Sequence, residues 1–362
     1  MKKAKIILQV FFIVAFALLL IAPFIGFLIL PEANVSNENR KLTGLPEQSF
    51  TKEYFQDFEL YFNDRFPNRQ KFIAKNAEIK IKYFKVSPFP DKVQIGNDGF
   101  LFINTDEALK SYSRRDLLTT DDLNKFVDKI VKKDSLLKAR GISYYFGYFP
   151  NKHNIYIEKL PKAMRVQIRD TISLATQLKK GLSLNGFTLF EPSVYPERKE
   201  ALRYLKLDTH WSNLGSFQAY QDFFKTFTEL DVTPYKYNDF RWRNVHQRFG
   251  DLTKLAGLDS IAGYEEYRPL SDLKSQSNKY VYDTLESLPP RAIRTTNNSI
   301  DAKQKKLLVF GDSYSNNMIP FYSLHFKEVI YLRDEYNQQM VDSIKPNIVL
   351  EVSVERFLYK HI

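Results

Sequence analysis

The segment over residues 305–317, KKLLVFGDSYSNN, contains the residue best suited to nucleophilic chemistry, Ser313. An apolar run over residues 307–310 predicts a buried strand, which Gly311 ends just before the serine. A strand, a glycine turn and a serine ahead of a helix is how α/β enzymes expose a nucleophile at the carboxyl edge of a sheet. The pattern fits equally a strand followed by a serine that caps a helix, because serine is a favoured N-cap residue. We expect a helix to start at Ser315, and the rest of the chain must decide between the two interpretations.

A serine nucleophile needs a general base, and the base needs a partner that orients it. The five histidines are His153, His210, His246, His325 and His361. His210 lies in the segment LDTHW, two residues after Asp208, whose carboxylate can accept a hydrogen bond from the imidazole if the backbone turns between them. Trp211 would form a wall of such a site, whereas the alternative is a loop histidine with an incidental acid nearby. His153 follows a predicted strand and is a second edge candidate, and the last two histidines are expected at the surface or in packing.

Strands that alternate with helices must position these residues, and they predict an α/β fold with a parallel sheet covered on both faces. The predicted strands cover residues 142–149, 187–190, 307–310, 328–332 and 347–352. The predicted helices cover residues 52–85 with a break near Pro67, 120–140 with a cap at Asp121 or Asp122, 164–182, 213–227 and 336–344. The remaining expectations are a turn and strand over residues 95–103, a loop with a short helix over 193–205, and an insertion of irregular and β structure over about 230–300.

The composition allows a large core and excludes cysteine chemistry. Hydrophobic residues make up 44% of the 362 residues and aromatic residues 15%, enough for one large domain or two ordinary ones. The chain has no cysteine, which excludes disulfides, thiolate metal sites and a cysteine nucleophile. The net charge of +11 favours an anionic partner such as a membrane surface or an acidic polymer. The lysines are scattered and no nucleic-acid-binding motif occurs, so we expect no nucleic-acid partner.

The N-terminal region contains a candidate membrane anchor. Residues 6–30 form an almost unbroken apolar run of 25 residues, longer than the roughly 20 residues needed to cross a bilayer. Lysines precede the run, which predicts a cytoplasmic tail over residues 1–5 and an exported remainder. A cleaved signal peptide is the alternative, but its apolar region is usually shorter and ends in a small-x-small site that LILPEANVS lacks. We therefore favour an uncleaved anchor, a linker over residues 31–50 and one domain over residues 51–362.

The segment LKLDTHWSNLGS, followed later in the chain by LLVFGDSYS, resembles the SGNH-like acetyltransferases of exopolysaccharide O-acetylation. These are the alginate acetylation proteins of the AlgX/AlgJ type and the related DHHW proteins. Four more segments resemble the family and occur in its order: YFNDRFPNR, IGNDGFLF, FPNKHNIYIEKLP and IVLEVSVERFL. The resemblance covers most of residues 40–362, and it implies an SGNH-hydrolase-like three-layer α/β/α fold.

The resemblance also implies roles for the residues of the two central motifs. By position, Ser313 is the nucleophile, His210 the base and Asp208 the residue that orients the base. The Asp-His pair precedes the serine, as in this acetyltransferase branch and unlike the order in ordinary SGNH hydrolases. Many relatives have D-H-H-W where this chain has D-T-H-W, so His210 is the only base that the motif offers.

Other residues near these motifs could line the site. Tyr314 and Arg356 are candidates for oxyanion or substrate contacts, although Arg356 could instead pair with a neighbouring glutamate. Asn151 and Lys152 could contact an acidic sugar, or could be loop residues on a solvated edge. We expect no metal and no other cofactor, because the acids are not spaced as a ligand set and no metal-binding or nucleotide-binding motif occurs.

The resulting hypothesis is a membrane-anchored O-acetyltransferase that acts on a polysaccharide at the outer face of a bacterial membrane or in the periplasm. The resemblance implies that a multi-pass membrane O-acyltransferase partner supplies the acetyl group. An acetylesterase would use the same three residues, with water in place of the sugar hydroxyl. A non-enzymatic protein of polysaccharide assembly or polymer binding is a third alternative, from a different class.

Overall fold

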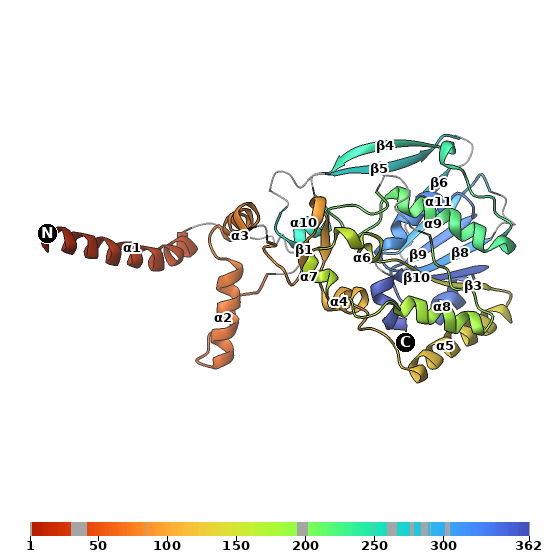
Figure 1. Cartoon of the computed structure of the whole chain (residues 1–362), viewed down its shortest axis with the longest axis horizontal. Coiled ribbons are helices and arrows are strands. Elements are labelled where there is room, and N and C mark those ends of the chain that lie inside the picture. Colours follow the sequence, from red (N-terminus) through yellow and green to blue (C-terminus); the bar gives the residue numbers. More distant parts are fainter. Residues whose placement is uncertain are drawn as a thin grey trace. The chain divides into compact units, whose positions relative to one another are not determined.

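The computed structural model of the chain describes residues 2–29, 42–84, 86–193, 202–247, 249–258, 266–275, 279–283, 289, 291–300 and 305–361. The chain divides into two compact units, Met1–Pro88 and Phe89–Ile362, whose elements are labelled in Figure 1. Most of the loop and short helix expected over residues 193–205 lies outside the described residues.

The described regular elements of the first unit are helices. They are α1 (Lys2–Ile29), α2 (Lys52–Asp64), α3 (Arg69–Ile79) and a short π-helical segment (Lys80–Phe84). The interruption between α2 and α3 contains Pro67, as the sequence predicts. Within α1, Lys5–Phe27 is long and apolar enough to cross a membrane, a criterion of length and composition that a signal sequence near an N-terminus also meets.

A central sheet organises the second unit. Its strands, in spatial order, are β3 (Ser143–Phe149), β10 (Ile348–Val354), β8 (Lys306–Gly311), β9 (Glu328–Leu332), β7 (Ile293–Asn297) and β6 (Tyr280–Asp283). The first four strands run parallel, whereas β7 is antiparallel to β9 and β6 is antiparallel to β7. The α/β prediction is therefore confirmed, but the sheet is mixed rather than wholly parallel.

The extra strands come from the region that the sequence analysis treats as an insertion. β7 pairs with β9, and its buried side chains, Thr295 and Asn297, also hydrogen-bond to Ser323. The same region also forms a separate two-stranded antiparallel sheet of β4 (Phe240–Gln247) and β5 (Glu266–Leu273). The expected β structure is therefore present, but part of it extends the main sheet.

Alternation along the buried strands supplies two apolar cores, one on each face of the sheet. Leu307 and Val309 of β8 enter one core, and Leu308 and Phe310 enter the other. The first core is covered by α9 (Asn213–Thr226) and α11 (Ile319–Tyr322), and the second by α5 (Thr120–Lys138), α8 (Leu174–Leu184) and α12 (Gln338–Ile344). Figure 1 shows α9 and α11 on the opposite side of the sheet from α5 and α8.

Several predicted boundaries are wrong for local reasons. The helix expected over residues 164–182 is two helices, α7 (Lys162–Arg165) and α8, because Ser173 caps a new start by accepting from Thr176 N–H. The cap of α5 is Thr119 rather than either aspartate, since its hydroxyl accepts from Asp122 N–H at 3.2 Å. The strand expected over residues 187–190 is a single bridge between Phe190 and Gly147 of β3.

The remaining described elements flank the sheet or connect its layers. They are the hairpin β1 (Val93–Ile95) and β2 (Leu101–Ile103), the helices α4 (Asp106–Tyr112), α6 (Lys152–Ile155) and α10 (Asp251–Leu255), and 3₁₀ turns at Asn97–Gly99, Ile157–Lys159, Thr228–Leu230, Tyr237–Asp239 and Glu355–His361. The hairpin confirms the turn and strand expected over residues 95–103. The first hairpin strand precedes a turn in which Asp98 and Gly99 both have positive φ, 55° and 78°.

Candidate active site

Ser313 lies at the carboxyl edge of the sheet, directly after a tight junction. Strand β8 ends at Gly311, where an added Cβ would meet the carbonyl oxygen of Val352 in β10 at 2.9 Å. The glycine is therefore needed for close approach of the two strands. A 3₁₀ helix, Ser313–Met318, begins immediately afterwards.

The cap of this helix is Asp312 rather than a serine. Its Oδ1 accepts from Tyr314 N–H at 2.9 Å, and its Oδ2 accepts from Val354 N–H at 2.7 Å. The helix thus begins at Ser313 and not at Ser315 as expected. The interpretation of Ser313 as the capping serine is wrong, and its hydroxyl makes a different contact.

That contact is with His210, although the two residues are far apart in sequence. Ser313 Oγ lies 2.7 Å from His210 Nε2, and Asp208 Oδ1 lies 2.6 Å from His210 Nδ1. The same carboxylate oxygen accepts from His210 N–H at 3.0 Å, so the backbone turns between the two residues as required. Both side chains keep access to solvent, with exposed fractions of 25% for His210 and 14% for Asp208. The distances are those that the sequence analysis expects for a serine, a base and an orienting acid.

The chemistry of the donors fixes the direction of these hydrogen bonds. Burial raises the pKa of the Asp208 carboxyl, but the hydrogen bond and charge of His210, with the N–H groups of His210 and Asp251, outweigh burial and lower that pKa below its ordinary value. An ionised carboxylate can only accept, so His210 Nδ1–H donates to Asp208. The other nitrogen of a neutral ring then carries a lone pair, and Ser313 O–H donates to it.

The segment that carries Asp208 has no regular secondary structure, so side chains from elsewhere hold its backbone. Glu266 accepts from Lys206 N–H at 2.5 Å and from Leu207 N–H at 3.1 Å. Lys152 Nζ donates to the carbonyl oxygens of Lys206 at 2.7 Å and Asp208 at 3.0 Å. A buried base and a buried acid therefore fix the chain just before His210.

Thr209 is held in the same way, from both sides. Asp251 accepts from Thr209 N–H at 2.7 Å and also from the Thr209 hydroxyl. The Thr209 carbonyl oxygen accepts from the Tyr314 hydroxyl, and the Tyr314 ring packs on the His210 ring with centroids 4.9 Å apart. Tyr314 is completely buried, so it supports His210 from behind and does not line a substrate surface, contrary to the expectation.

Asn151 and Lys152 are also interior residues. Their exposed fractions are 0% and 3%, so neither the acidic-sugar contact nor the solvated-edge alternative is correct. Asn151 Nδ2 donates to Ser111 Oγ at 2.8 Å. Lys152 also donates to the Leu101 carbonyl oxygen at 2.8 Å, and burial lowers the pKa of its ammonium to about 7. Lys152 is therefore a support of the Asp208 segment.

Trp211 and Arg356 pack around Tyr314. Trp211 is fully buried, and its Nε1–H donates to the Tyr314 carbonyl oxygen at 3.1 Å. Arg356 donates to Asn151 Oδ1 at 3.3 Å, and its guanidinium lies 5.6 Å from the centre of the Tyr314 ring. Trp211 thus backs the site from the core rather than forming an exposed wall, and Arg356 is 8% exposed.

The glutamates near Arg356 have other partners. Glu351 accepts from Lys133 at 2.6 Å and from the Tyr144 hydroxyl at 2.7 Å. Glu355 accepts from Asn151 N–H at 2.9 Å and from Asn154 Nδ2 at 2.6 Å. The structure therefore gives Arg356 an amide and aromatic rings as neighbours in place of the expected glutamate pair.

His153 and His325 have hydrogen-bond partners other than Ser313. His153 Nε2 lies 2.9 Å from the Ile103 carbonyl oxygen, its ring stacks on Tyr112, and burial lowers its pKa to about 3. His325 Nε2 lies 2.6 Å from the Tyr220 hydroxyl, and burial lowers its pKa to about 4. The expectation of a packing role holds for His325, whereas the His361 side chain lies outside the described residues.

Sequence reasoning missed Asp251 and Glu266. Each begins an ordinary element, α10 or β5, and an acid at the start of a helix is common. Nothing in the local sequence connects either residue to the segment around Asp208. Their role follows only from the tertiary fold.

Among the described residues, Asp208, His210 and Asp251 form a group whose ligand atoms lie within 4.8 Å of one another. Such spacing could hold a metal ion. However, Asp208 Oδ1 and His210 Nδ1 already bond to each other, and Asp251 accepts from Thr209. A metal ion there would have to displace the contact that orients His210.

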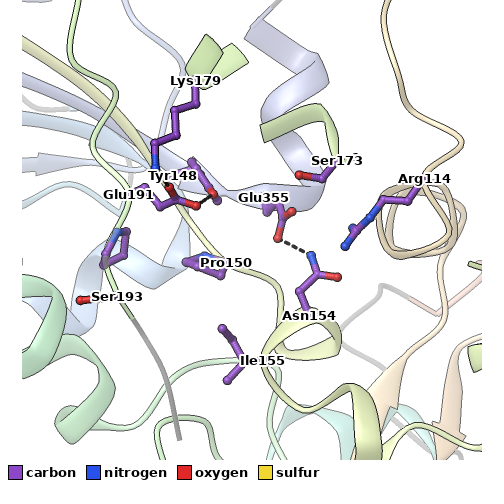
Figure 2. A pocket seen from close by; sticks show the side chains of 11 residues that line it. Arg114, Tyr148, Pro150, Asn154, Ile155, Ser173, Lys179, Glu191, Ser193 and Glu355 are labelled. Carbon is purple, nitrogen blue, oxygen red and sulfur yellow. Dashed lines mark hydrogen bonds and ion pairs between the residues drawn. The ribbon is translucent and has the colours of Figure 1, made fainter. Parts of the chain in front are cut away.

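A separate cavity of about 340 Å³ lies beyond the end of β3. Figure 2 shows that Asn154 donates to Glu355 on one side of the cavity. On the other side, Lys179 and the Tyr148 hydroxyl both donate to Glu191. Asp208, His210 and Ser313 are not among the lining residues, whereas Glu355, which accepts from Asn151 N–H, is one of them. The cavity is therefore separate from these three residues.

A mixed sheet with a serine after a central strand and an Asp-His pair facing that serine is the arrangement of SGNH-like α/β proteins. Residues 93–341 match the family model described as "SGNH hydrolase-like domain, acetyltransferase AlgX". The match covers more than half of the chain, so the chain belongs to this acetyltransferase family. A comparison with curated proteins gives no match.

Solved structures of similar fold include a DHHW family protein from Eubacterium siraeum, with 12% identity, a TM-score of 0.51, and coverage of 74% of this chain and 95% of that chain. Bacillus cereus PatB1 with a sulfonyl adduct has 16% identity and a TM-score of 0.50, and the match covers 74% of this chain and 97% of that chain. The O-acetyltransferase domain of Pseudomonas putida AlgJ has 17% identity and a TM-score of 0.45, and the match covers 74% of this chain and 92% of that chain. At these identities the first two likenesses concern the fold alone.

Proposed function

We propose that this protein is a membrane-anchored O-acetyltransferase that transfers acetyl groups to a polysaccharide through an acetyl-Ser313 intermediate. The single observation that supports this proposal best is the continuous hydrogen-bond chain from Asp208 through His210 to Ser313. Membership of the acetyltransferase family gives the reaction class. The catalytic roles of the three residues are part of the proposal.

In the first half-reaction, His210 Nε2 removes the hydroxyl proton as Ser313 Oγ bonds to the carbonyl carbon of an acetyl donor. Asp208 stabilises the imidazolium that forms, because its carboxylate already accepts from Nδ1–H. The bond from the acetyl carbon to the donor's leaving group then breaks, and the leaving group takes the proton from His210. The Ser313 N–H, which begins the 3₁₀ helix, is the first oxyanion donor, and one such donor is typically worth about 3 kcal/mol.

In the second half-reaction, a sugar hydroxyl takes the place of the leaving group. His210 Nε2 removes its proton, the sugar oxygen bonds to the acetyl carbon, and the bond to Ser313 Oγ breaks. Ser313 Oγ recovers the proton from His210. The enzyme is thus restored and one acetate ester is formed on the sugar.

Location and partners follow from the N-terminal helix and the family. The apolar helix α1 would hold the protein in the bacterial cell membrane, with the second unit in the periplasm or at the extracellular face. A multi-pass membrane O-acyltransferase would deliver the acetyl group across the membrane. The acceptor would be an exopolysaccharide or a cell-surface glycan.

The proposal is tested with the full-length chain in detergent micelles, supplied with an activated acetyl ester and candidate glycans. We expect acetylated glycan to form, and to be absent with Ser313→Ala. Release of acetate to water alone would support an acetylesterase with the same residues. Equal behaviour of Ser313→Ala and the unchanged chain would contradict the proposal and favour a non-enzymatic polymer-binding role.

A further inference from the structure

A second carboxylate, Asp251, approaches the His210 ring from an element that is distant in sequence. Helix α10 begins at Asp251, immediately after Gly250. An added Cβ at Gly250 would lie 2.2 Å from the Leu207 carbonyl oxygen, so glycine is what lets the two backbones touch. Leu252 N–H then donates to that carbonyl oxygen at 3.2 Å. This backbone contact places Asp251 beside the Asp208 segment.

The backbone N–H and both carboxylate oxygens of Asp251 contact the segment from Asp208 to His210. Its backbone N–H donates to Asp208 Oδ2 at 3.2 Å. Its Oδ1 accepts from Thr209 N–H at 2.7 Å, and its Oδ2 accepts from the Thr209 hydroxyl. That second oxygen also lies 3.6 Å from His210 Nδ1, the nitrogen that donates to Asp208. Asp208 therefore accepts from the imidazole N–H, and Asp251 places a second carboxylate within 4 Å of the same nitrogen.

We propose that Asp251 is a positioning residue that fixes the turn at Thr209 and adds a second negative charge beside His210. This inference rests on the proposed function. As Ser313 gives its proton to His210 Nε2, the ring becomes positive, and a carboxylate at 3.6 Å stabilises that charge. Neither carboxylate takes the proton, which stays on His210 until the leaving group removes it. The Thr209 hydroxyl is the link, and it belongs to the residue that replaces the first histidine of D-H-H-W.

The charges around the ring come from several elements. Asp208 belongs to the ring's own segment, Asp251 to α10 and Glu266 to β5, while the Lys152 ammonium from α6 binds the Asp208 carbonyl oxygen. Burial raises the pKa of Asp251, as does the charge of Asp208, and the contacts with His210 and Thr209 act against this rise. Asp208 and Asp251 are the two carboxylates beside the ring, at 2.6 and 3.6 Å from His210 Nδ1.

The test replaces Asp251 with Asn, which keeps the shape and can still accept from Thr209 N–H, but removes the charge. Asp251→Asn and its control, Thr209→Val, are measured as full-length chains in detergent. With Asp251→Asn we expect the rate of Ser313 acetylation to fall about tenfold, because the imidazolium loses a nearby negative charge. A tenfold loss corresponds to about 1.4 kcal/mol in the activation free energy. Less negative charge makes the ring release its proton at lower pH, so the acid limb of the pH–rate profile should move to lower pH.

Thr209→Val is the matched structural control. It removes the hydroxyl that donates to Asp251 but leaves both charges in place. We expect a slower rate with the acid limb at the position of the unchanged chain. An unshifted acid limb in Asp251→Asn, with only a loss of rate or stability, would mean that Asp251 is purely structural and would overturn the inference.

A second readout does not depend on turnover. NMR titration of the His210 ring, assigned with His210→Gln, should show a lower midpoint in Asp251→Asn than in the unchanged chain. If the midpoint shifts while the unchanged chain never acetylates Ser313, the proposed function fails but the role of Asp251 beside His210 stands. If Ser313 is acetylated normally and the midpoint does not move, the inference about Asp251 alone is wrong.

Discussion

At the scale of single residues, the account depends on which atoms donate and which accept around His210. Asp208 Oδ1 accepts from both the ring and the backbone of His210. One carboxylate oxygen therefore fixes the ring's tautomer and its orientation together. Ser313 Oγ can reach His210 because Asp312, and not the serine, caps the following helix.

Replacement of Asp208 with Asn tests this assignment. The amide offers an N–H where the carboxylate accepts, so the ring is held in the wrong tautomer, and we expect acetylation of Ser313 to fall by about 10³–10⁴-fold. The matched control is Asp342→Asn, which removes an exposed acid paired with Arg140. Acetylation kinetics on the two variants, followed by mass spectrometry, decide the matter, and equal rates would contradict the assigned role.

At the scale of elements, the site depends on two close contacts between segments, each made at a glycine, which has no side chain. Gly311 lets β8 approach β10, and Gly250 lets α10 approach the Asp208 segment. In both places a backbone carbonyl oxygen, of Val352 or of Leu207, occupies the space that a Cβ atom would need. The positions of Ser313 and Asp251 therefore depend on these two glycines.

Gly250→Ala should separate α10 from the Asp208 segment. The new Cβ would overlap the Leu207 carbonyl oxygen, so we expect a loss of stability of about 1–3 kcal/mol and a larger loss of acetylation rate. Gly44→Ala is the control, because an added Cβ at Gly44 meets nothing within 4 Å. Thermal denaturation and kinetics on both variants test this prediction, which an unchanged rate in Gly250→Ala would refute.

The sequence predicted the elements with strong patterns better than those that depend on tertiary contacts. β9 has the predicted bounds, and β8, β10 and α9 differ from prediction by one or two residues, because their apolar periodicity is strong. β6 and β7 are polar and short, so they were not assigned to the sheet. Likewise, the spacing of Asp208 and His210 predicts a contact that the structure contains. Nothing in the local sequence predicts that Lys152 is buried.

At the scale of the whole molecule, several titratable groups are buried in neutral form. His153 is the clearest, since burial lowers its pKa from 6.5 to about 3. Between those values the unfolded chain binds a proton that the folded chain does not, so stability falls as the pH falls. The fold should therefore weaken as the pH drops from about 6.5 toward 3.

His153→Phe should reduce this dependence on pH. The variant loses the hydrogen bond to the Ile103 carbonyl oxygen, so at neutral pH we expect it to be less stable by about 1 kcal/mol. Below pH 6.5 its free energy of unfolding should fall less steeply than that of the unchanged chain. His246→Gln, at an exposed position of β4, serves as the control, and parallel curves for all three proteins in denaturant titrations would contradict the prediction.

The proposed anchor makes a second prediction at this scale. If α1 stays in the bilayer, the protein should remain in the membrane fraction after alkaline carbonate washing, because a spanning helix is not removed by loss of charge contacts. The N-terminal sequence of the purified protein should begin at the start of the chain. A soluble product that begins after residue 30 would show a cleaved signal peptide instead.

The central claim, that Ser313 carries the acetyl group, has one direct measurement. The full-length chain is treated briefly with an activated acetyl ester, quenched in acid, digested and mapped by mass spectrometry. We predict one acetyl group on Ser313, lost in His210→Gln and unaffected in Ser193→Ala, whose hydroxyl donates to Asp222 beside the cavity of Figure 2. Acetylation at Ser193, or acetylation of Ser313 that does not require His210, would contradict the account.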